Sequence, residues 1–336
     1  MRLKAIEEQV VVIFGASSGI GRETALRFAR RGAKVVAAAR TESALASLMA
    51  EIQRLGGDAI YRTADAADFE QVKGVADLAI ARFGRLDTWV HLAATAVIGP
   101  FAQTTPEEFK RVIEVDLLGQ VYGAMAALPH LKREGGALVH ITSVEARRSM
   151  PLQSSYSAAK HGVEGFLEAL RLELAHEGAP VSVTNILPGV INSPFYSKVR
   201  SRLGVKPTSI PPFYDPEIVA DAILYAAEHP VRDMIVGDAG RALEFLQRLS
   251  PAAADALLLA IGFAGQRTDV PRSADDPDNL FGTVPDERVD GDYGNLVIPS
   301  FFDWLDRIPA TPALLGTAAL GAVALVAGRV LGGDRQ

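Results

Sequence analysis

Residues 154–160 place a tyrosine and a lysine where they could exchange protons. If this stretch is helical, Tyr156 and Lys160 lie at i and i+4, on one face of the helix. A free phenol titrates near pH ~10 and is too weak an acid to exchange protons readily at neutral pH. An ammonium one turn away favours the phenolate and lowers the pKa of the phenol. The pair is therefore predicted to act as an acid and a base, and an ordinary surface Tyr and Lys are the alternative.

A glycine-rich turn near the N-terminus could hold the phosphates of a nucleotide. The apolar run at residues 9–14 predicts a strand buried on both faces, and residues 22–31 predict a helix. Glycines between them let the backbone approach a pyrophosphate, and the helix N-terminus adds free N–H groups. The strand–turn–helix order favours a dinucleotide site over a tight turn without a ligand. The candidate binding residues are Gly15, Ser17, Ser18, Gly19, Ile20 and Gly21.

The end of the second predicted strand, residues 34–39, carries a basic residue. In NAD-binding folds an acidic residue at this place binds the ribose hydroxyls, whereas here Arg40 follows the strand. A guanidinium suits a 2′-phosphate, so the sequence favours NADP(H) over NAD(H) as the cofactor. A solvated loop arginine is the alternative.

Strands and helices alternate along the rest of the first 190 residues. Further strands are predicted at residues 59–63, 88–94, 137–142 and 181–187, and helices at 42–55, 69–83, 106–128 and 156–176. This alternation indicates an α/β fold with a doubly wound parallel sheet of the Rossmann type, whose ligands bind at the carboxyl ends of the strands. The groups that follow such ends are the glycine turn, Arg40, Asp65, Ala93, Ser143 and Pro188-Gly189.

Composition limits the class of protein. The chain has 336 residues, of which 49% are hydrophobic and 22% charged, a composition typical of a globular chain with a substantial core. A formal net charge of −6 gives no sign of a nucleic-acid partner. With no cysteine, disulfides and thiolate metal sites are excluded, no metal site is predicted, and a reducing cytoplasm is compatible. The charged residues 1–8 lack the apolar core of a secretory signal, so a cytoplasmic location is expected.

Together these motifs resemble the short-chain dehydrogenase/reductase family. The resemblance spans about residues 8–245 and implies an enzyme that interconverts an alcohol and a ketone or aldehyde. It also implies dimers or tetramers, formed through the helices predicted at 106–128 and 156–176. The matching positions are residues 15–21, Asp65, Ser143, Tyr156 to Lys160, and Pro188-Gly189.

The resemblance implies a role for each matching residue. Tyr156 would be the general acid and base, and Lys160 would lower the pKa of Tyr156 and bind the nicotinamide ribose. Ser143 would bind the substrate oxygen and stabilise its developing charge. The cofactor contacts would come from Asp65 at the adenine, from Ile20 and Ala93 along the cofactor, and from Pro188, Gly189 and Ile191 beside the nicotinamide.

Two positions depart from the family pattern. Residues 91–94 replace the usual Asn-Asn-Ala-Gly, and Asp116 stands where the family usually has an Asn that holds a proton-relay water. Asp116 could pair with Lys160 and weaken the effect of the lysine on Tyr156. A subgroup with a C-terminal extension and a motif like residues 277–280 also lacks this Asn, which suggests that the change is tolerated. The alternative is a protein that binds the nucleotide without turnover, as a redox sensor or scaffold.

The loops predicted to form the substrate pocket, residues 144–153 and 190–214, indicate an apolar alcohol or carbonyl substrate. Arg147 and Arg148 could contact an acidic group, with solvent exposure as the alternative. Aromatic walls are expected from Phe195, Tyr196, Phe213 and Tyr214.

Three segments are predicted along the chain. Residues 1–250 are predicted to form the NADP(H)-binding catalytic domain. Residues 251–310 are predicted to form a helical and irregular extension, in which 268–294 is an irregular or extended linker. Residues 311–336 form an apolar tail. Because residues 313–328 carry no charge, residues 311–331 approach the length that spans a ~30 Å hydrocarbon core. A membrane anchor and a helix packed on the domain or on a partner chain are both open for this tail.

Overall fold

The computed structural model of the chain describes residues 1–273 and 275–301. Residues Met1–Ile298 form one compact unit, and Pro299–Gln336 form a second. The predicted apolar tail, residues 311–336, lies outside the described residues, so its role as a membrane anchor stays a prediction. The expected segment boundaries at residues 250 and 310 also stay predictions.

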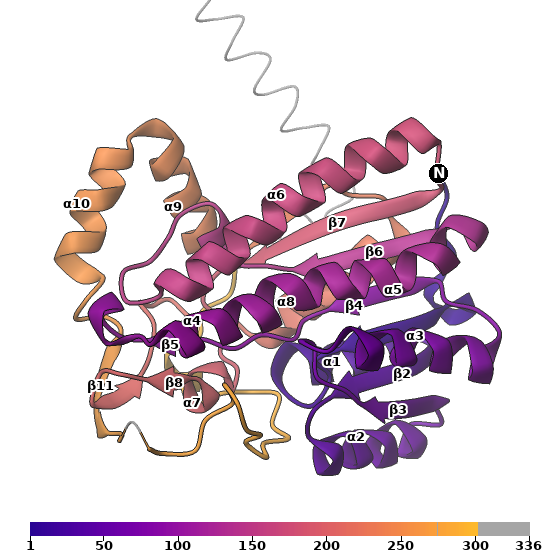
Figure 1. Cartoon of the computed structure of the whole chain (residues 1–336), viewed down its shortest axis with the longest axis horizontal. Helices are drawn as coiled ribbons and strands as arrows, with labels where there is room; N and C mark the ends of the chain where they lie inside the picture. The colour runs from indigo at the N-terminus through magenta and orange to yellow at the C-terminus, as the bar shows by residue number, and fades with distance from the viewer. Residues whose placement is uncertain (274, 302–336) are drawn as a thin grey trace, which may run out of the picture. The chain divides into compact units, whose positions relative to one another are not determined.

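A seven-stranded sheet forms the centre of the first unit (Figure 1). All neighbouring strands pair in parallel, in the order β10-β7-β6-β4-β1-β2-β3. The chain order runs outward from β1 on one side and from β4 on the other, which confirms the doubly wound Rossmann-type fold and puts its switch point between β1 and β4. The strands are β1 (Val10–Phe14), β2 (Lys34–Ala39), β3 (Ala59–Thr63), β4 (Thr88–His91), β6 (Gly136–Ile141), β7 (Val181–Pro188) and β10 (Asp233–Val236).

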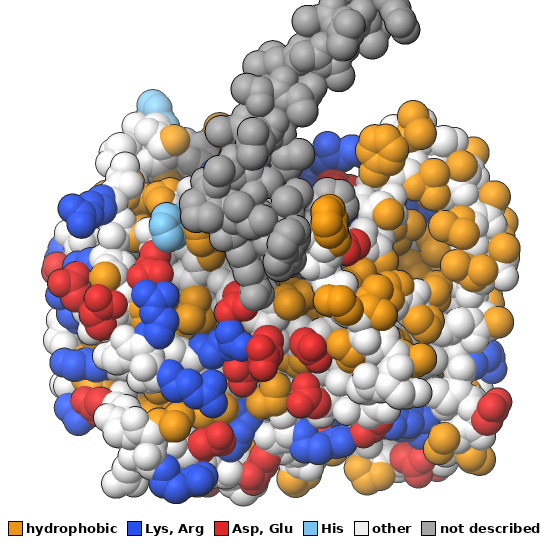
Figure 2. Space-filling model, turned by 180° about the vertical axis from the view of Figure 1, so that it is seen from behind, with side chains coloured by type: hydrophobic (Ala, Val, Ile, Leu, Met, Phe, Trp, Pro, Cys, Tyr) orange, Lys and Arg blue, Asp and Glu red, His pale blue; other side chains and the backbone are white. Residues whose placement is uncertain are grey.

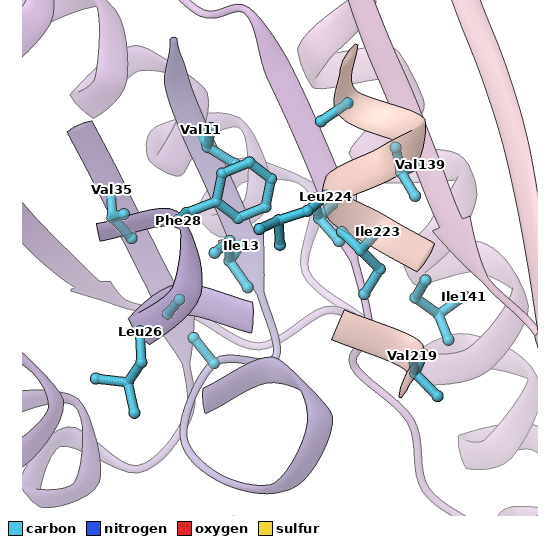
Figure 3. Packing of buried hydrophobic residues seen from close by; sticks show 14 of the residues in the cluster. Val11, Ile13, Leu26, Phe28, Val35, Val139, Ile141, Val219, Ile223 and Leu224 are labelled. Atoms are coloured by element: carbon cyan, nitrogen blue, oxygen red, sulfur yellow. The ribbon is translucent and has the colours of Figure 1, made fainter. Parts of the chain in front are cut away.

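Helices cover both faces of the sheet because side chains alternate along its strands. On β1, Val11 and Ile13 point to one face, while Val10 and Phe14 point to the other. Figure 3 shows how Phe28 and other helical side chains pack over the first face. The first face packs against α1 (Gly19–Arg30), α2 (Glu42–Arg54) and α8 (Pro216–Glu228), and the second against α3 (Phe69–Phe83), α5 (Gly119–Glu134) and α6 (Ser154–Glu177).

The helix predicted at residues 106–128 is interrupted. It consists of α4 (Pro106–Ile113), a π-helical turn η3 (Glu114–Leu118) and α5. The π-helical turn contains Asp116, which is fully buried. Within the described residues, Pro106–Glu134 is the one helical stretch long and apolar enough to cross a membrane, and half of its most apolar window is buried inside the protein, as in a core helix.

The C-terminal extension as far as Ile298 belongs to the first unit. Two helices, α9 (Asp238–Leu249) and α10 (Pro251–Ile261), are followed by β11 (Arg267–Pro271), which pairs antiparallel with β9 (Val205–Pro207). The expectation of an irregular segment at 268–294 holds for the described residues between β11 and η5, but the segment is not a free linker. Residues 277–292, here called the strap, accept hydrogen bonds from Arg40, Arg111 and Gly19. The remaining elements are η1 (Ile6–Glu8), β5 (Val97–Ile98), η2 (Phe101–Gln103), η4 (Val144–Ala146), α7 (Phe195–Lys198), β8 (Arg200–Ser201) and η5 (Gly294–Leu296).

Candidate active site

A cavity of about 440 Å³ lies at the carboxyl ends of the strands. All the candidate site residues line it except Asp116, which lies behind Lys160. The cavity is thus where the topology of a doubly wound sheet places a ligand. The predicted residues that line it are Gly15, Ser17, Ser18, Gly19, Ile20, Gly21, Arg40, Asp65, Ala93, Ser143, Tyr156, Lys160, Pro188, Gly189 and Ile191.

The glycine turn leaves room that other residues would fill. Gly15 has φ +105°, and a Cβ on it would lie 2.7 Å from the backbone nitrogen of Ala93. A Cβ on Gly21 would lie 2.2 Å from the carbonyl oxygen of Gly15. Only glycine therefore fits both positions, and the turn brings the backbone at the start of α1 to the cavity.

Arg40 offers an unsatisfied positive group beside the same cavity. One guanidinium nitrogen donates to the carbonyl oxygen of Asn279 in the strap. The other terminal nitrogen, Nη1, is buried and has no hydrogen-bond partner among the described residues. A buried donor of this kind costs free energy unless a ligand binds it, so the residues here fit an anionic cofactor group. Close by, Asp65 pairs with Arg111 and accepts from the backbone nitrogen of Ala67 at 3.0 Å.

The structure brings the three candidate catalytic side chains together. Ser143 follows β6 and hydrogen-bonds the side chain of Tyr156. Tyr156 and Lys160 lie one turn apart on α6, as the spacing predicts. The Nζ atom of Lys160 lies 5.2 Å from the centroid of the Tyr156 ring and donates to the carbonyl oxygen of Ile141 at 3.4 Å.

The predicted lowering of the pKa of Tyr156 is wrong for this structure. Burial raises the pKa of the Tyr156 phenol well above its ordinary value, and the nearby carboxyl groups of Glu145 and Asp116 raise it further. The hydrogen bond with Ser143 opposes this only in part. The spacing of Tyr156 and Lys160 could not predict the direction of this pKa shift, because spacing does not show that the phenol is buried or that Glu145 and Asp116 lie near it. The phenol therefore keeps its proton at neutral pH.

Asp116 pairs with Lys160, as its position suggests. Its Oδ2 atom lies 3.4 Å from Lys160 Nζ, and its Oδ1 atom accepts from the backbone nitrogen of Thr95 at 2.8 Å. Burial raises the pKa of Asp116 to about 6, against the opposing charge of Lys160. The carboxyl group is therefore largely ionised above neutrality and shares the charge of the lysine.

Glu145 is a site residue that the sequence did not single out. Its carboxylate lines the cavity and accepts from the hydroxyl of Ser157 at 2.6 Å. Burial raises the pKa of Glu145 to about 7. A carboxylate two residues after Ser143 was visible in the sequence, but nothing there indicated that it would be buried beside Tyr156.

The substrate side of the cavity is mainly apolar. Phe195 and Tyr196 line it, whereas the other two predicted aromatic walls are buried elsewhere. Phe213 stacks on Tyr293 at 4.5 Å, and the hydroxyl of Tyr214 accepts from the backbone nitrogen of Ala239. Apolar side chains unforeseen from the sequence come from α9 and α10, namely Leu243, Leu257, Leu258 and Ile261.

The two arginines proposed as substrate contacts are paired within the protein instead. Arg147 lies 2.6 Å from the carboxylate of Glu164. Arg148 forms an ion pair with Asp255 at 2.6 Å and donates to Gln247. Neither arginine lines the cavity, so a contact with an acidic substrate group finds no support here.

A doubly wound sheet with a glycine turn and a Ser–Tyr–Lys site at its carboxyl edge is typical of a nucleotide-dependent oxidoreductase, and comparison with known proteins indicates the same class. The profile of the short chain dehydrogenase family matches residues 9–204. The chain therefore belongs to the short-chain dehydrogenase/reductase family, whose members are NAD(P)-dependent oxidoreductases acting on CH–OH groups.

Individual relatives are similar over most of the chain. The uncharacterized oxidoreductase YxnA of Bacillus subtilis is 42% identical over 284 residues, which cover 84% of this chain and 80% of that protein. Dehydrogenase/reductase SDR family member 7B of Bos taurus is 32% identical over 264 residues, covering 75% of this chain and 81% of that protein. A solved alcohol dehydrogenase from Thermococcus sibiricus, in complex with 5-hydroxy-NADP, matches with a TM-score of 0.60 and 26% identity, covering 68% of this chain and 95% of that one.

Proposed function

We propose that the chain is an NADP(H)-dependent oxidoreductase that interconverts an apolar alcohol and its ketone or aldehyde. The observation that carries the proposal is the meeting of Ser143, Tyr156 and Lys160 with the glycine turn and Arg40 around one cavity. A protein that only bound the nucleotide would have little need of Ser143 beside Tyr156. Family membership also favours an enzyme over a redox sensor or scaffold.

The proposed chemistry assigns one step to each side chain. A nicotinamide bound in the cavity supplies or accepts the hydride at the substrate carbon. During reduction, Tyr156 donates its phenolic proton to the carbonyl oxygen, which becomes the alcohol hydroxyl. Ser143 hydrogen-bonds the same oxygen as its negative charge develops. Lys160 stabilises the phenolate that Tyr156 becomes when it has donated its proton. The raised pKa means that Tyr156 carries the proton before the reaction begins, as a proton donor must.

The preference for NADP(H) rests on Arg40. Its buried, unpartnered Nη1 would be satisfied by a 2′-phosphate, and no carboxylate takes the place of Arg40 at the end of β2. The solved relative that was crystallised with an NADP derivative is consistent with this choice.

An apolar substrate is supported by the walls of the cavity. Phe195, Tyr196 and Leu258 face it together with apolar side chains of α9 and α10. The same two helices also expose hydrophobic side chains to solvent, with Phe245 68% and Leu259 72% exposed. Figure 2 shows hydrophobic side chains gathered on the side of the molecule that carries these helices. An apolar compound would meet few charged groups on its way to Tyr156.

Arg40→Ala tests the cofactor assignment. The variant should bind NADPH about 10- to 100-fold more weakly, the range expected for a lost charge-assisted contact, and bind NADH within about 3-fold of the wild type. Fluorescence titration of both nucleotides measures the affinities. Arg82→Ala, which removes an exposed arginine paired with Asp58, is the matched control. Equal effects on NADPH and NADH would contradict the role of Arg40.

A further inference from the structure

Lys198, the last residue of α7, reaches the glycine turn from a distant part of the chain. Lys198 is 8% exposed, and its Nζ atom donates to the Ser18 hydroxyl at 2.7 Å and to the carbonyl oxygen of Asp286 at 3.2 Å. Neither acceptor carries a charge at the contacting atom. Among residues 1–273 and 275–301, no carboxylate forms an ion pair with this lysine.

A buried ammonium without a paired carboxylate is costly to keep. Burial lowers the pKa of Lys198 to about 8; attraction by Asp286 opposes this shift in part, and repulsion by Arg288 adds to it. An anion bound beside Nζ would lower this cost and favour the charged form. The position of Lys198 beside Ser18 therefore fits an anionic ligand lying on the glycine turn.

The strap holds this lysine in place. The backbone nitrogen of Asn279 donates to the carbonyl oxygen of Lys198 at 2.8 Å, and the Gly19 nitrogen donates to the carbonyl oxygen of Arg288 at 2.9 Å. Leu280 of the strap is fully buried and packs against Val97, Val112 and Ala159. The backbone carbonyl oxygen of Asn279 also accepts a hydrogen bond from Arg40, so the strap contacts both Arg40 and Lys198.

We propose that Lys198 binds the diphosphate of the dinucleotide and that the strap, residues 277–292, holds it over the glycine turn. This inference rests on the proposed function, because it needs a dinucleotide in the cavity. The strap lies outside residues 9–204, the part of the chain that matches the family profile. The cationic subsite is therefore built in part by the C-terminal extension.

Lys198→Met separates this subsite from that of Arg40, because it removes the charge and keeps an unbranched side chain. The full-length protein is titrated with NADPH, with ADP-ribose, which carries the diphosphate alone, and with 2′-AMP, which carries the 2′-phosphate alone. We expect the affinities for NADPH and ADP-ribose to fall about 10- to 100-fold and that for 2′-AMP to change by less than about 3-fold. Lys73→Met is the matched control, because Lys73 is an exposed lysine that pairs with Asp77 on α3 and does not line the cavity.

The titrations distinguish a failure of the Lys198 proposal from a failure of the proposed function. Unchanged ADP-ribose affinity in Lys198→Met, with NADPH selectivity still dependent on Arg40, would overturn the role of Lys198 and leave the proposed function standing. A wild-type protein that binds no nucleotide would overturn both. Retained 2′-AMP binding shows that the variant is folded. If it does not fold, Lys198→Arg decides: ADP-ribose affinity within about 5-fold of the wild type supports a charge contact, and a loss above about 10-fold opposes it.

Discussion

Single residues around Tyr156 set its protonation state. Glu145 and Asp116 are both buried, and the pKa values of their carboxyl groups are raised by burial to about 7 and about 6. Once ionised, each favours the protonated phenol of Tyr156. Lys160 cannot fully offset them, since its Nζ atom pairs with Asp116 and lies over the face of the Tyr156 ring. The site therefore keeps Tyr156 protonated, which is the form that reduction requires.

Removing either carboxylate should make Tyr156 more acidic. Alcohol oxidation needs the phenolate, so kcat/KM for oxidation rises with pH as Tyr156 loses its proton. In Asp116→Asn and in Glu145→Gln this rise should occur at a pH lower by roughly one unit. The shift should be larger for Glu145→Gln, because Glu145 acts more strongly on Tyr156. pH–rate profiles measure it. Glu164→Gln, at a residue paired with Arg147, is the control, and profiles that coincide for all three variants would contradict the account.

At the scale of elements, local pattern predicted most of the fold. The run of Val and Ile in β1 and the periodic apolar residues of α3 reappear as buried faces, because local sequence and burial agree there. The π-helical turn Glu114–Leu118 breaks a continuous helical pattern, and no local signal marks it. The polar composition of the strap predicts a linker. Composition carries no information about the contacts that Asn279 and Leu280 make with residues far away in sequence.

Some residues of the candidate site could be predicted from the sequence and others could not. Tyr156, Lys160 and the glycine turn have fixed local spacing, so the sequence revealed them and the structure places them at one cavity. Lys198 and Glu145 could not be found by spacing, because what singles them out is burial imposed by the tertiary structure. The direction of the pKa shift of Tyr156 was missed for the same reason.

Undocking the strap should weaken cofactor binding more than it weakens the fold. Leu280 packs in a small cluster with Val97, Val112 and Ala159, and a buried Leu→Ala change costs about 2–5 kcal/mol. We expect this loss to open the strap while the sheet stays folded, so Leu280→Ala should mainly lower NADPH affinity, by about 10-fold, and expose residues 277–292 to protease. Phe281→Ala, at a half-exposed neighbour, is the control. A large fall in the unfolding temperature with unchanged NADPH affinity would show instead that the strap is part of the folding core.

At the scale of the whole molecule, the compact unit Met1–Ile298 holds every residue assigned to the site. The homo-oligomer stays a prediction, supported by exposed apolar side chains on the two helices expected to form it: Met125 on α5 is 55% exposed and Leu172 on α6 is 72% exposed. The cytoplasmic location and the membrane anchor stay predictions too.

Removing residues 302–336 should leave this unit intact. The shortened chain keeps the sheet, the cavity and the strap, so we expect its NADPH affinity within about 2-fold and its unfolding temperature within about 3 °C of the full chain. Titration and calorimetry measure both. Flotation with lipid vesicles then tests the tail, since an anchor at residues 311–331 requires that only the full chain floats. A shortened chain that does not fold would show that the tail contributes to the core.

The most direct test of the central claim is NADPH oxidation with a panel of apolar ketones and aldehydes, by the wild type and by Tyr156→Phe. The account predicts turnover by the wild type. It predicts a loss of about 10³-fold or more in the variant, which cannot donate the proton, with NADPH affinity unchanged. Turnover by Tyr156→Phe at the wild-type rate, with the same substrate, would contradict the assignment of Tyr156 as the acid.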